Sequence, residues 1–117
     1  MRITIVAGAR PNFIKIAPII KAIEKNQNEG HAISYRLVHT GQHYDKNLSD
    51  TFFKELNIPN PNTNLEVKSG SQAVQTAAIM IAFEQELVQS PCDLVLVVGD
   101  VNSTMACVIV VIKLYII

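Results

Sequence analysis

The stretch "RITIVAGARPNFIK" (residues 2–15) decides how the whole chain is interpreted. Ile3 to Val6 form an apolar run without alternation, which is typical of a parallel strand covered on both faces. A short turn, Ala7-Gly8-Ala9, ends the run. From Phe13 onward apolar side chains recur at helical spacing. The stretch therefore predicts a strand, a tight turn and a helix, which is the repeating unit of an α/β protein.

The predicted first helix contains a proline, Pro18, which leaves two starting points open. Either the helix begins near Pro18 and holds it in the first turn, or it begins near Asn12 and bends at Pro18. The region of Gly30 ends it. The side chains expected to face the core are Phe13, Ile16, Ala17, Ile20 and Ile23.

Strands and helices alternate along the rest of the chain. The expected elements are a strand at 33–39, a helix at 45–56, an irregular connector at 57–64, a helix at 71–88, a strand at 93–98, a helix from 102 or 103 to about 114, and the start of a strand at 115–117. Such alternation implies a parallel sheet wound by right-handed crossovers. The predicted fold class is α/β, a partial Rossmann-like parallel sheet with flanking helices, in one incomplete domain over residues 1–117.

Two details of this prediction concern the later elements. Ser69 and Gln72 fit a capping box that would start the helix at 71–88. Its core-facing side is expected to hold Ala73, Ala77, Met80, Ile81, Glu84 and Leu87. The strand at 93–98 is expected to be the most buried one, because it is apolar throughout.

Composition excludes several classes of protein. Ten basic side chains balance ten acidic ones, so the clustered positive charge of nucleic-acid binders is absent. Cys92 and Cys107 match no metal spacing and are interpreted as free thiols in a reducing compartment. The chain opens directly on a strand without a signal-peptide pattern, and its most apolar stretch, 105–117, is too short for a membrane span. We therefore expect a cytoplasmic location.

Three predicted loops meet at the carboxyl ends of the strands, where open α/β sheets bind their ligands. They are 8–12, 40–43 and 99–103. The first is not G-x-G-x-x-G, so the fingerprint of a nicotinamide or flavin dinucleotide is absent. No metal cluster is visible in the sequence. No cofactor is predicted.

The first loop carries two cations, Arg10 and, one turn further on, Lys15. Arginine offers a planar fork of donors suited to phosphate, and a helix start adds backbone N–H groups and the positive end of a dipole. These features suit a diphosphate. The alternative interpretation is a pair of surface cations near a helix start.

The other two loops hold the remaining candidates. His43 is suited to donating to phosphate or moving a proton near neutral pH, unless it is simply a polar loop residue. Asp100 either caps the following helix or faces the same cleft as Arg10 and approaches a sugar there. Ser103 and Thr104 carry hydroxyl groups suited to ligand binding or to capping.

Three motifs together, "GARPNFIKIAP" (8–18), "TGQHYD" (40–45) and "VLVVGDVNST" (95–104), resemble the first part of the non-hydrolysing UDP-N-acetylglucosamine 2-epimerases. The resemblance implies the N-terminal domain of a GT-B-type fold, with a C-terminal domain absent. It also implies that Arg10 and Lys15 lie near the diphosphate and substrate, that Asp100 takes part in the chemistry, and that His43 lies near the cleft. Ala9, Asn12 and Val101 depart from the residues usual in that family, which are Thr, Glu and Thr.

The implied reaction inverts C2 of the sugar, through elimination and re-addition of UDP. The family's other catalytic residues lie beyond Ile117, so this chain alone is expected to be inactive. Two alternatives stay open, an inert nucleotide-sugar-binding half-domain and a fragment of a GT-B glycosyltransferase. Expected partners are a UDP-sugar and a second copy of the chain, but neither nucleic acid nor membrane. The copies would meet through the apolar C-terminal segment or an open sheet edge.

Overall fold

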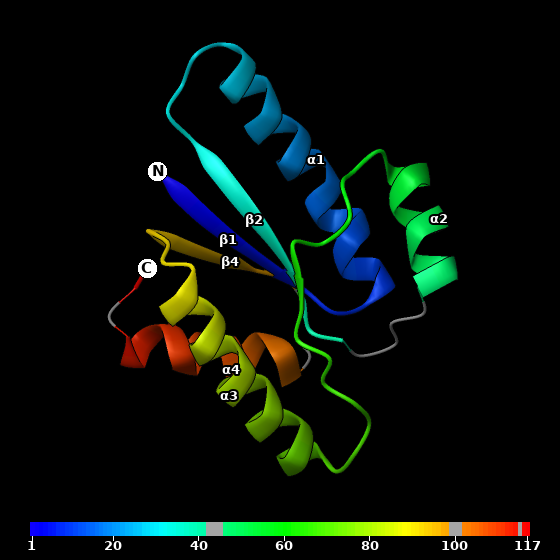
Figure 1. Cartoon of the computed structure of the whole chain (residues 1–117), viewed down its shortest axis with the longest axis vertical. Coiled ribbons are helices and arrows are strands. Elements are labelled where there is room, and N and C mark those ends of the chain that lie inside the picture. The colour runs from blue at the N-terminus through cyan, green and yellow to red at the C-terminus, as the bar shows by residue number, and fades with distance from the viewer. Residues whose placement is uncertain (42–45, 99–101, 115) are drawn as a thin grey trace.

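The computed structural model describes the chain except for residues 42–45, 99–101 and 115, and describes the backbone alone at 46–49 and 102. Four parallel strands alternate with four helices (Figure 1). In chain order they are β1 (Arg2–Ala7), α1 (Arg10–Asn28), β2 (Ser34–His39), α2 (Lys46–Leu56), β3 (Thr63–Asn64), α3 (Gln72–Gln89), β4 (Leu94–Val97) and α4 (Asn102–Lys113).

The strands lie in the order β3-β2-β1-β4. Val6 in β1 is in register with Val38 in β2 on one side and with Val97 in β4 on the other. β1 is therefore the central strand and is buried from Ile3 onward, whereas all four residues of β4 are only half-buried. The prediction that residues 93–98 form the most buried strand is wrong, because β4 lies at an edge of the described sheet.

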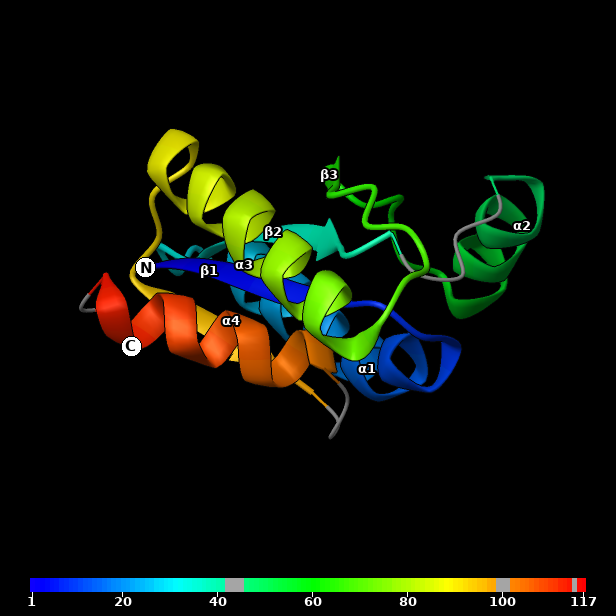
Figure 2. The same ribbon diagram turned by 90° about the horizontal axis from the view of Figure 1, so that it is seen from below.

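Helices cover both faces of the sheet (Figure 2). Ile5 and Leu37 point to the face covered by α1, where Phe53 of α2 joins the same core. Val6 and Val38 point to the opposite face, which α3 and α4 cover. The successive residues of each strand thus supply two separate cores, as the pleat of a doubly covered sheet requires.

α1 confirms its predicted core face. It begins at Arg10, so the start is the earlier of the two alternatives, and Pro18 lies inside the helix on its exposed side. Gly30 follows the helix with a φ of +89°, a conformation that favours glycine. The five side chains predicted to face the core, Phe13, Ile16, Ala17, Ile20 and Ile23, are all buried.

α3 buries a different face from the predicted one. Of the predicted residues, Leu87 is buried and Met80 is half-buried against the core, but Ile81 is 62% exposed and Ala73, Ala77 and Glu84 are exposed. Ile79 and Phe83 are buried in their place. The prediction was wrong because α3 is apolar on two sides, and periodicity alone does not say which side meets the sheet. Its start differs as well, since Ser71 is the N-cap and its hydroxyl accepts a hydrogen bond from the N–H of Val74 at 3.1 Å.

The connector at 57–64 is not wholly irregular. Its last two residues form β3, which pairs with Val38 and His39 of β2. Just before β3, Asn62 extends this pairing, because its side-chain oxygen accepts from the N–H of Leu37 and its own N–H donates to the Leu37 carbonyl, both at 2.8 Å. A two-residue strand is too short to leave a periodic signal in the sequence.

The end of the chain lies against β4. The N–H of Val95 donates to the carbonyl of Ile117 at 2.7 Å, but residues 116 and 117 do not form a strand, so the predicted strand start at 115–117 is not found in its described part. Residue 115 itself is outside the described part. Among the described helices none has the length and apolarity needed to cross a membrane.

Candidate functional site at the carboxyl edge of the sheet

The strand order changes direction between β1 and β4. From β1 the chain moves outward through β2 to β3, and then returns to place β4 on the other side of β1. The segments that follow β1 and β4 therefore leave the same edge of the sheet side by side. In open α/β sheets this switch point is where ligands bind.

The turn after β1 is shaped by Asn12. Its side-chain oxygen accepts from the N–H of Ala9 at 3.1 Å and of Gly8 at 3.4 Å, and the residue is only 5% exposed. A side chain three positions into a helix that accepts from the N-cap N–H forms one half of a capping box. Asn12 thus performs this capping role with an uncharged side chain.

A glycine is needed at position 8 because the side chain of Thr40 leaves no room for a Cβ, and not because of its own backbone conformation. A Cβ added at Gly8 would stand 2.3 Å from the hydroxyl oxygen of Thr40, which follows β2. That hydroxyl is fully buried and has no hydrogen-bond partner in the described structure. A glycine at position 8 therefore allows the loops after β1 and β2 to come into contact.

Arg10 opens α1 and is exposed. Its guanidinium carbon lies 4.5 Å from the ring centroid of Phe52 in α2, a cation–π contact that restricts the side chain without neutralising its charge. Phe52 is held in turn by Phe13 of α1 at 6.4 Å in an edge-to-face arrangement and by Phe53 at 6.1 Å. An aromatic cluster therefore positions the cation beside the positive end of the α1 dipole.

Lys15 is exposed as well, but it does not share a side of α1 with Arg10. Five residues along an α-helix correspond to a rotation of about 140° around its axis. Among the ion pairs of the described residues none includes Arg10 or Lys15. Both charges are therefore open to an anion, though from different sides of the helix.

The other two predicted site residues, His43 and Asp100, lie outside the described residues. The described chain on either side of Asp100 is joined by the hydroxyl of Thr104, which donates to the carbonyl of Val98 at 3.1 Å. Ser103 beside it is buried. Thr104 thus ties the start of α4 to the end of β4.

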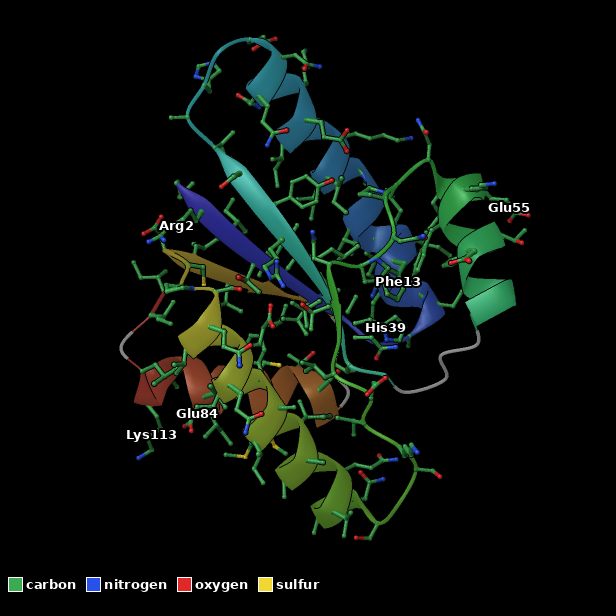
Figure 3. All side chains as sticks on the ribbon, in the orientation of Figure 1. Arg2, Phe13, His39, Glu55, Glu84 and Lys113 are labelled. Atoms are coloured by element: carbon green, nitrogen blue, oxygen red, sulfur yellow. The ribbon has the colours of Figure 1, made fainter. Side chains whose placement is uncertain are left out.

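His39 was not predicted to matter, yet it is the buried titratable group nearest this edge among the described residues. Its ring lies 5.2 Å from that of Phe13 (Figure 3), and its Nδ1 accepts from the N–H of Gly41 at 2.8 Å. Burial lowers the pKa of His39 to about 4. The ring is therefore neutral at pH 7 with its proton on Nε2. The alternation Tyr35, Leu37, His39 along β2 was the sequence signal for its inward orientation.

A hollow of about 330 Å³ lies beyond the ends of β2 and β3, lined by Gly41, Asn64, Glu66 and Lys68. Gly41 has a φ of +102°, and a Cβ there would stand 2.5 Å from the backbone nitrogen of Val67. Gly41 belongs to the predicted loop 40–43, whereas Asn64, Glu66 and Lys68 were given no role, because the contact between residue 41 and residues 66–67 comes from tertiary packing.

The described residues include no group of His, Cys, Asp and Glu that could hold a metal ion. Cys92 and Cys107 are free thiols. Burial raises the pKa of Cys107 to about 12, so this thiol stays protonated and unreactive at neutral pH. The cysteines therefore contribute no chemistry to the carboxyl edge.

Comparison with known proteins gives a consistent family assignment. Residues 24–117 match the family described as UDP-N-acetylglucosamine 2-epimerase. The UDP-N-acetylglucosamine 2-epimerase of Methanocaldococcus jannaschii is 41% identical over 114 residues, which cover 97% of this chain and 30% of that protein. The UDP-2,3-diacetamido-2,3-dideoxy-D-glucuronate 2-epimerase of Pseudomonas aeruginosa is 38% identical over 99% of this chain and 32% of its own length.

The fold agrees with the same family. The crystal structure of the M. jannaschii enzyme in complex with UDP-GlcNAc and UDP superposes with a TM-score of 0.88, over 99% of this chain and 31% of that one. Such epimerases have a GT-B fold, which confirms the predicted fold class. The chain covers the N-terminal part of these relatives and spans about 30% of their length.

Proposed function

Because the chain belongs to the UDP-N-acetylglucosamine 2-epimerase family, we propose that it forms the diphosphate-binding part of an enzyme that interconverts UDP-GlcNAc and UDP-ManNAc. One observation carries the proposal: the segments bearing Arg10 and Asp100 follow adjacent parallel strands on either side of the switch point. In the whole enzyme a second, C-terminal domain completes the cleft.

The proposed reaction breaks the bond between C1 of the sugar and the UDP oxygen. Negative charge then develops on the diphosphate, and preorganised positive groups lower the barrier to its departure. Arg10, held against Phe52, and the N-terminus of α1 supply them. Lys15 adds a second cation from another side of the helix, and His43 donates a hydrogen bond at the edge of the cleft.

Elimination also requires that the proton on C2 be removed, and we assign this step to the Asp100 carboxylate. Loss of that proton with UDP gives a 2-acetamidoglucal. Its conversion to the other epimer requires a proton on the opposite face of C2 and the return of UDP to C1, hence an acid opposite the base. Since this chain offers one carboxylate for the work, we propose that it does not epimerise by itself.

A second substrate has support from one observation, the 38% identity with an epimerase acting on a UDP-2,3-diacetamido sugar acid. The two substrates share UDP and differ in the sugar. Because Arg10 and Lys15 are proposed to bind the diphosphate, which both substrates contain, binding is tested with UDP first. UDP-GlcNAc and the diacetamido sugar nucleotide then distinguish the two candidates.

Isothermal titration calorimetry of the chain with UDP tests the role of Arg10. The Arg10→Ala variant should bind UDP about tenfold more weakly, a loss of about 1.4 kcal/mol, because a charge-assisted hydrogen bond to phosphate is removed. Arg2→Ala is the matched control. Arg2 is also an exposed arginine, but it lies at the opposite end of β1, beside Asp93 at 3.6 Å. Equal losses in both variants would contradict the proposed site.

Two further variants separate binding from chemistry. Asp100→Asn should leave UDP affinity nearly unchanged, and Lys15→Ala should weaken it by less than Arg10→Ala does. Lys21→Ala, an exposed lysine further along α1, serves as the control for Lys15. Incubation of the chain with UDP-GlcNAc, followed by NMR, should show no UDP-ManNAc. If the chain alone forms UDP-ManNAc, the proposal that the acid opposite Asp100 comes from another part of the enzyme is wrong.

We also propose that the chain acts in the cytoplasm as a homo-oligomer. The free thiols Cys92 and Cys107 support a reducing compartment. Exposed apolar side chains on α4, among them Met105 and Ile112, support association between copies.

A further inference from the structure

Three aromatic rings lie one after another between the sheet and Arg10. His39 is the last residue of β2, and its ring lies 5.2 Å from that of Phe13 in α1 (Figure 3). Phe13 meets Phe52 of α2 edge to face at 6.4 Å. The ring of Phe52 lies 4.5 Å from the guanidinium carbon of Arg10. We call His39, Phe13 and Phe52 the aromatic row.

The aromatic row becomes more exposed toward Arg10. His39 and Phe13 are buried, so close packing in the core fixes both rings. Phe52 is half-buried, and its neighbour Phe53, whose ring lies 6.1 Å away, is buried. Arg10 is exposed. Phe52 is therefore a ring at the surface that buried rings hold in place.

His39 is fixed by the backbone on either side of it. It is in register with Ala7 of β1 and with Asn64 of β3, and its Nδ1 accepts from the N–H of Gly41 at 2.8 Å. Burial holds its pKa at about 4, so at neutral pH the ring adds no positive charge next to Phe13. The proposed reaction gives this residue no part, yet it is the buried end of the row that leads to Arg10.

A ring holds a cation without using up its charge. The face of an aromatic ring attracts a guanidinium through its quadrupole, whereas a carboxylate would compete with phosphate for the same N–H donors. No ion pair of the described residues includes Arg10. A side chain that is restricted before the ligand arrives loses less freedom on binding, which favours affinity. The contact with Phe52 therefore suits a cation that has to meet an anion.

We propose that Phe52 is the positioning residue of Arg10 for the diphosphate of a UDP-sugar, and that His39 supports Phe52 through Phe13. The inference rests on the proposed function. It adds to that function residues from α2 and β2, two elements in which no site residue was predicted. Loss of the Phe52 ring should weaken binding of the diphosphate even though the charge of Arg10 remains.

The NMR spectrum of the free chain tests the position of Arg10 without any nucleotide. A ring shifts protons that lie over its face upfield, so the side-chain protons of Arg10 should lie upfield of those of Arg2, which is also exposed. Phe52→Leu should abolish this shift, and Phe52→Tyr should retain it. His39→Asn keeps an acceptor for the N–H of Gly41 but removes the ring, and it should reduce the shift. An unchanged Arg10 spectrum in Phe52→Leu would overturn the inference.

Calorimetry with UDP tests the consequence for binding. Phe52→Leu should bind UDP about threefold more weakly than the wild type, because Arg10 has to be ordered during binding. In the Arg10→Ala background the same substitution should cause no further loss, since the two side chains act as one unit. Phe52→Tyr should bind like the wild type. Equal losses from Phe52→Leu in both backgrounds would contradict the positioning role.

Phe53→Leu is the matched control, because Phe53 is the next residue of α2 and is 1% exposed, but no cation of the described structure lies over its ring. In urea denaturation it should destabilise the chain more than Phe52→Leu does, yet it should change UDP affinity less. A merely structural role of Phe52 predicts the same order in both measurements. Circular dichroism verifies that each variant is folded.

The two proposals fail in different ways. If Arg10→Ala weakens UDP binding but Phe52→Leu does not, the positioning role is wrong and the nucleotide site stands. If the wild-type chain shows the upfield shift of Arg10 but binds no UDP, the nucleotide site is wrong, and the shift still supports the placement of Arg10 by Phe52.

Discussion

Two neighbouring residues of β2 show how differently the two helical layers are attached to the sheet. Tyr35 points toward α1, where its hydroxyl donates to Glu24 at 3.4 Å in a half-buried setting. Arg36 points toward α3, where its guanidinium donates to Glu86 at 2.6 Å and to the hydroxyl of Thr63 at 2.6 Å. Each layer thus receives a contact from β2 to a carboxylate, but only the contact to α3 is short and ends on a buried carboxylate.

The difference reflects what surrounds each glutamate. Glu86 is 6% exposed in an otherwise apolar layer, so its charge requires Arg36, and Thr63 of β3 completes the network by donating to the same carboxylate oxygen at 3.2 Å. Glu24 lies at the margin of the α1 layer, and water reaches it. The outer surfaces follow the opposite trend, since α1 presents Lys15, Lys21 and Lys25 to solvent beside Ile14 and Ile19, whereas the exposed part of α3 has no lysine or arginine and includes Val74, Ile81 and Val88. The layer with the more polar interior contact therefore has the more apolar exterior.

The largest effect is expected at Glu86. Replacing it in Glu86→Ala should lower the free energy of unfolding by about 2 to 3 kcal/mol, because the short hydrogen bond from Arg36 and the one from Thr63 to this carboxylate are both lost. Urea denaturation measures the loss. Glu84→Ala on the same helix is the control and should change stability by less than about 0.5 kcal/mol, since Glu84 is exposed. Similar losses of stability at both positions would mean that the ion pair between Arg36 and Glu86 does not stabilise the α3 layer.

A smaller effect is expected from acid, and it arises in the α1 layer. Burial holds the pKa of His39 at about 4 in the folded chain, against 6.5 in the unfolded one. Between these values the unfolded state binds more protons, so stability falls as pH falls. The loss between pH 7 and pH 5 should be about 2 kcal/mol. It should disappear in His39→Gln, whereas His31→Gln, at an exposed histidine, should retain it.

The smallest effect is expected at the contact between Tyr35 and Glu24. Tyr35→Phe should cost less than about 1 kcal/mol, because the hydrogen bond is long and half-exposed. Burial first, and then Glu24, raise the pKa of Tyr35 to about 12. In Glu24→Gln, NMR titration should give a lower pKa than in the wild type but one still above the ordinary value of 10. A full return to that value would show that burial contributes nothing.

The sequence predicted the elements well where pattern and context agreed. The inner face of α1 was predicted correctly because Lys15, Lys21 and Lys25 lie on its other sides and leave one continuous apolar face, although Ile14 and Ile19 are exposed. α3 was assigned the wrong face because Ile81 and Ile79 are equally apolar, and only packing against the sheet distinguishes them. β3 was missed because its two residues, Thr63 and Asn64, follow a run of prolines and asparagines and are too few to show a strand pattern.

In the candidate site, too, the sequence predicted what depends on local pattern and missed what depends on tertiary packing. Arg10 was predicted to stand at the start of a helix after a strand, and the structure places it there. Its contact with Phe52 depends on how α2 docks on α1, and the burial of His39 depends on Phe13, so neither followed from local sequence. The roles of Lys15, His43 and Asp100 remain predictions for the binding experiments.

The close approach of Gly8 and Thr40 has a consequence for protein engineering. A Cβ added at position 8 would lie 2.3 Å from the hydroxyl oxygen at position 40, so the two residues share one volume. A library that varies position 8 alone will recover mostly glycine, because any Cβ there collides with the hydroxyl of the unchanged Thr40. Substrate preference at this edge of the sheet is therefore best explored by randomising positions 8 and 40 jointly.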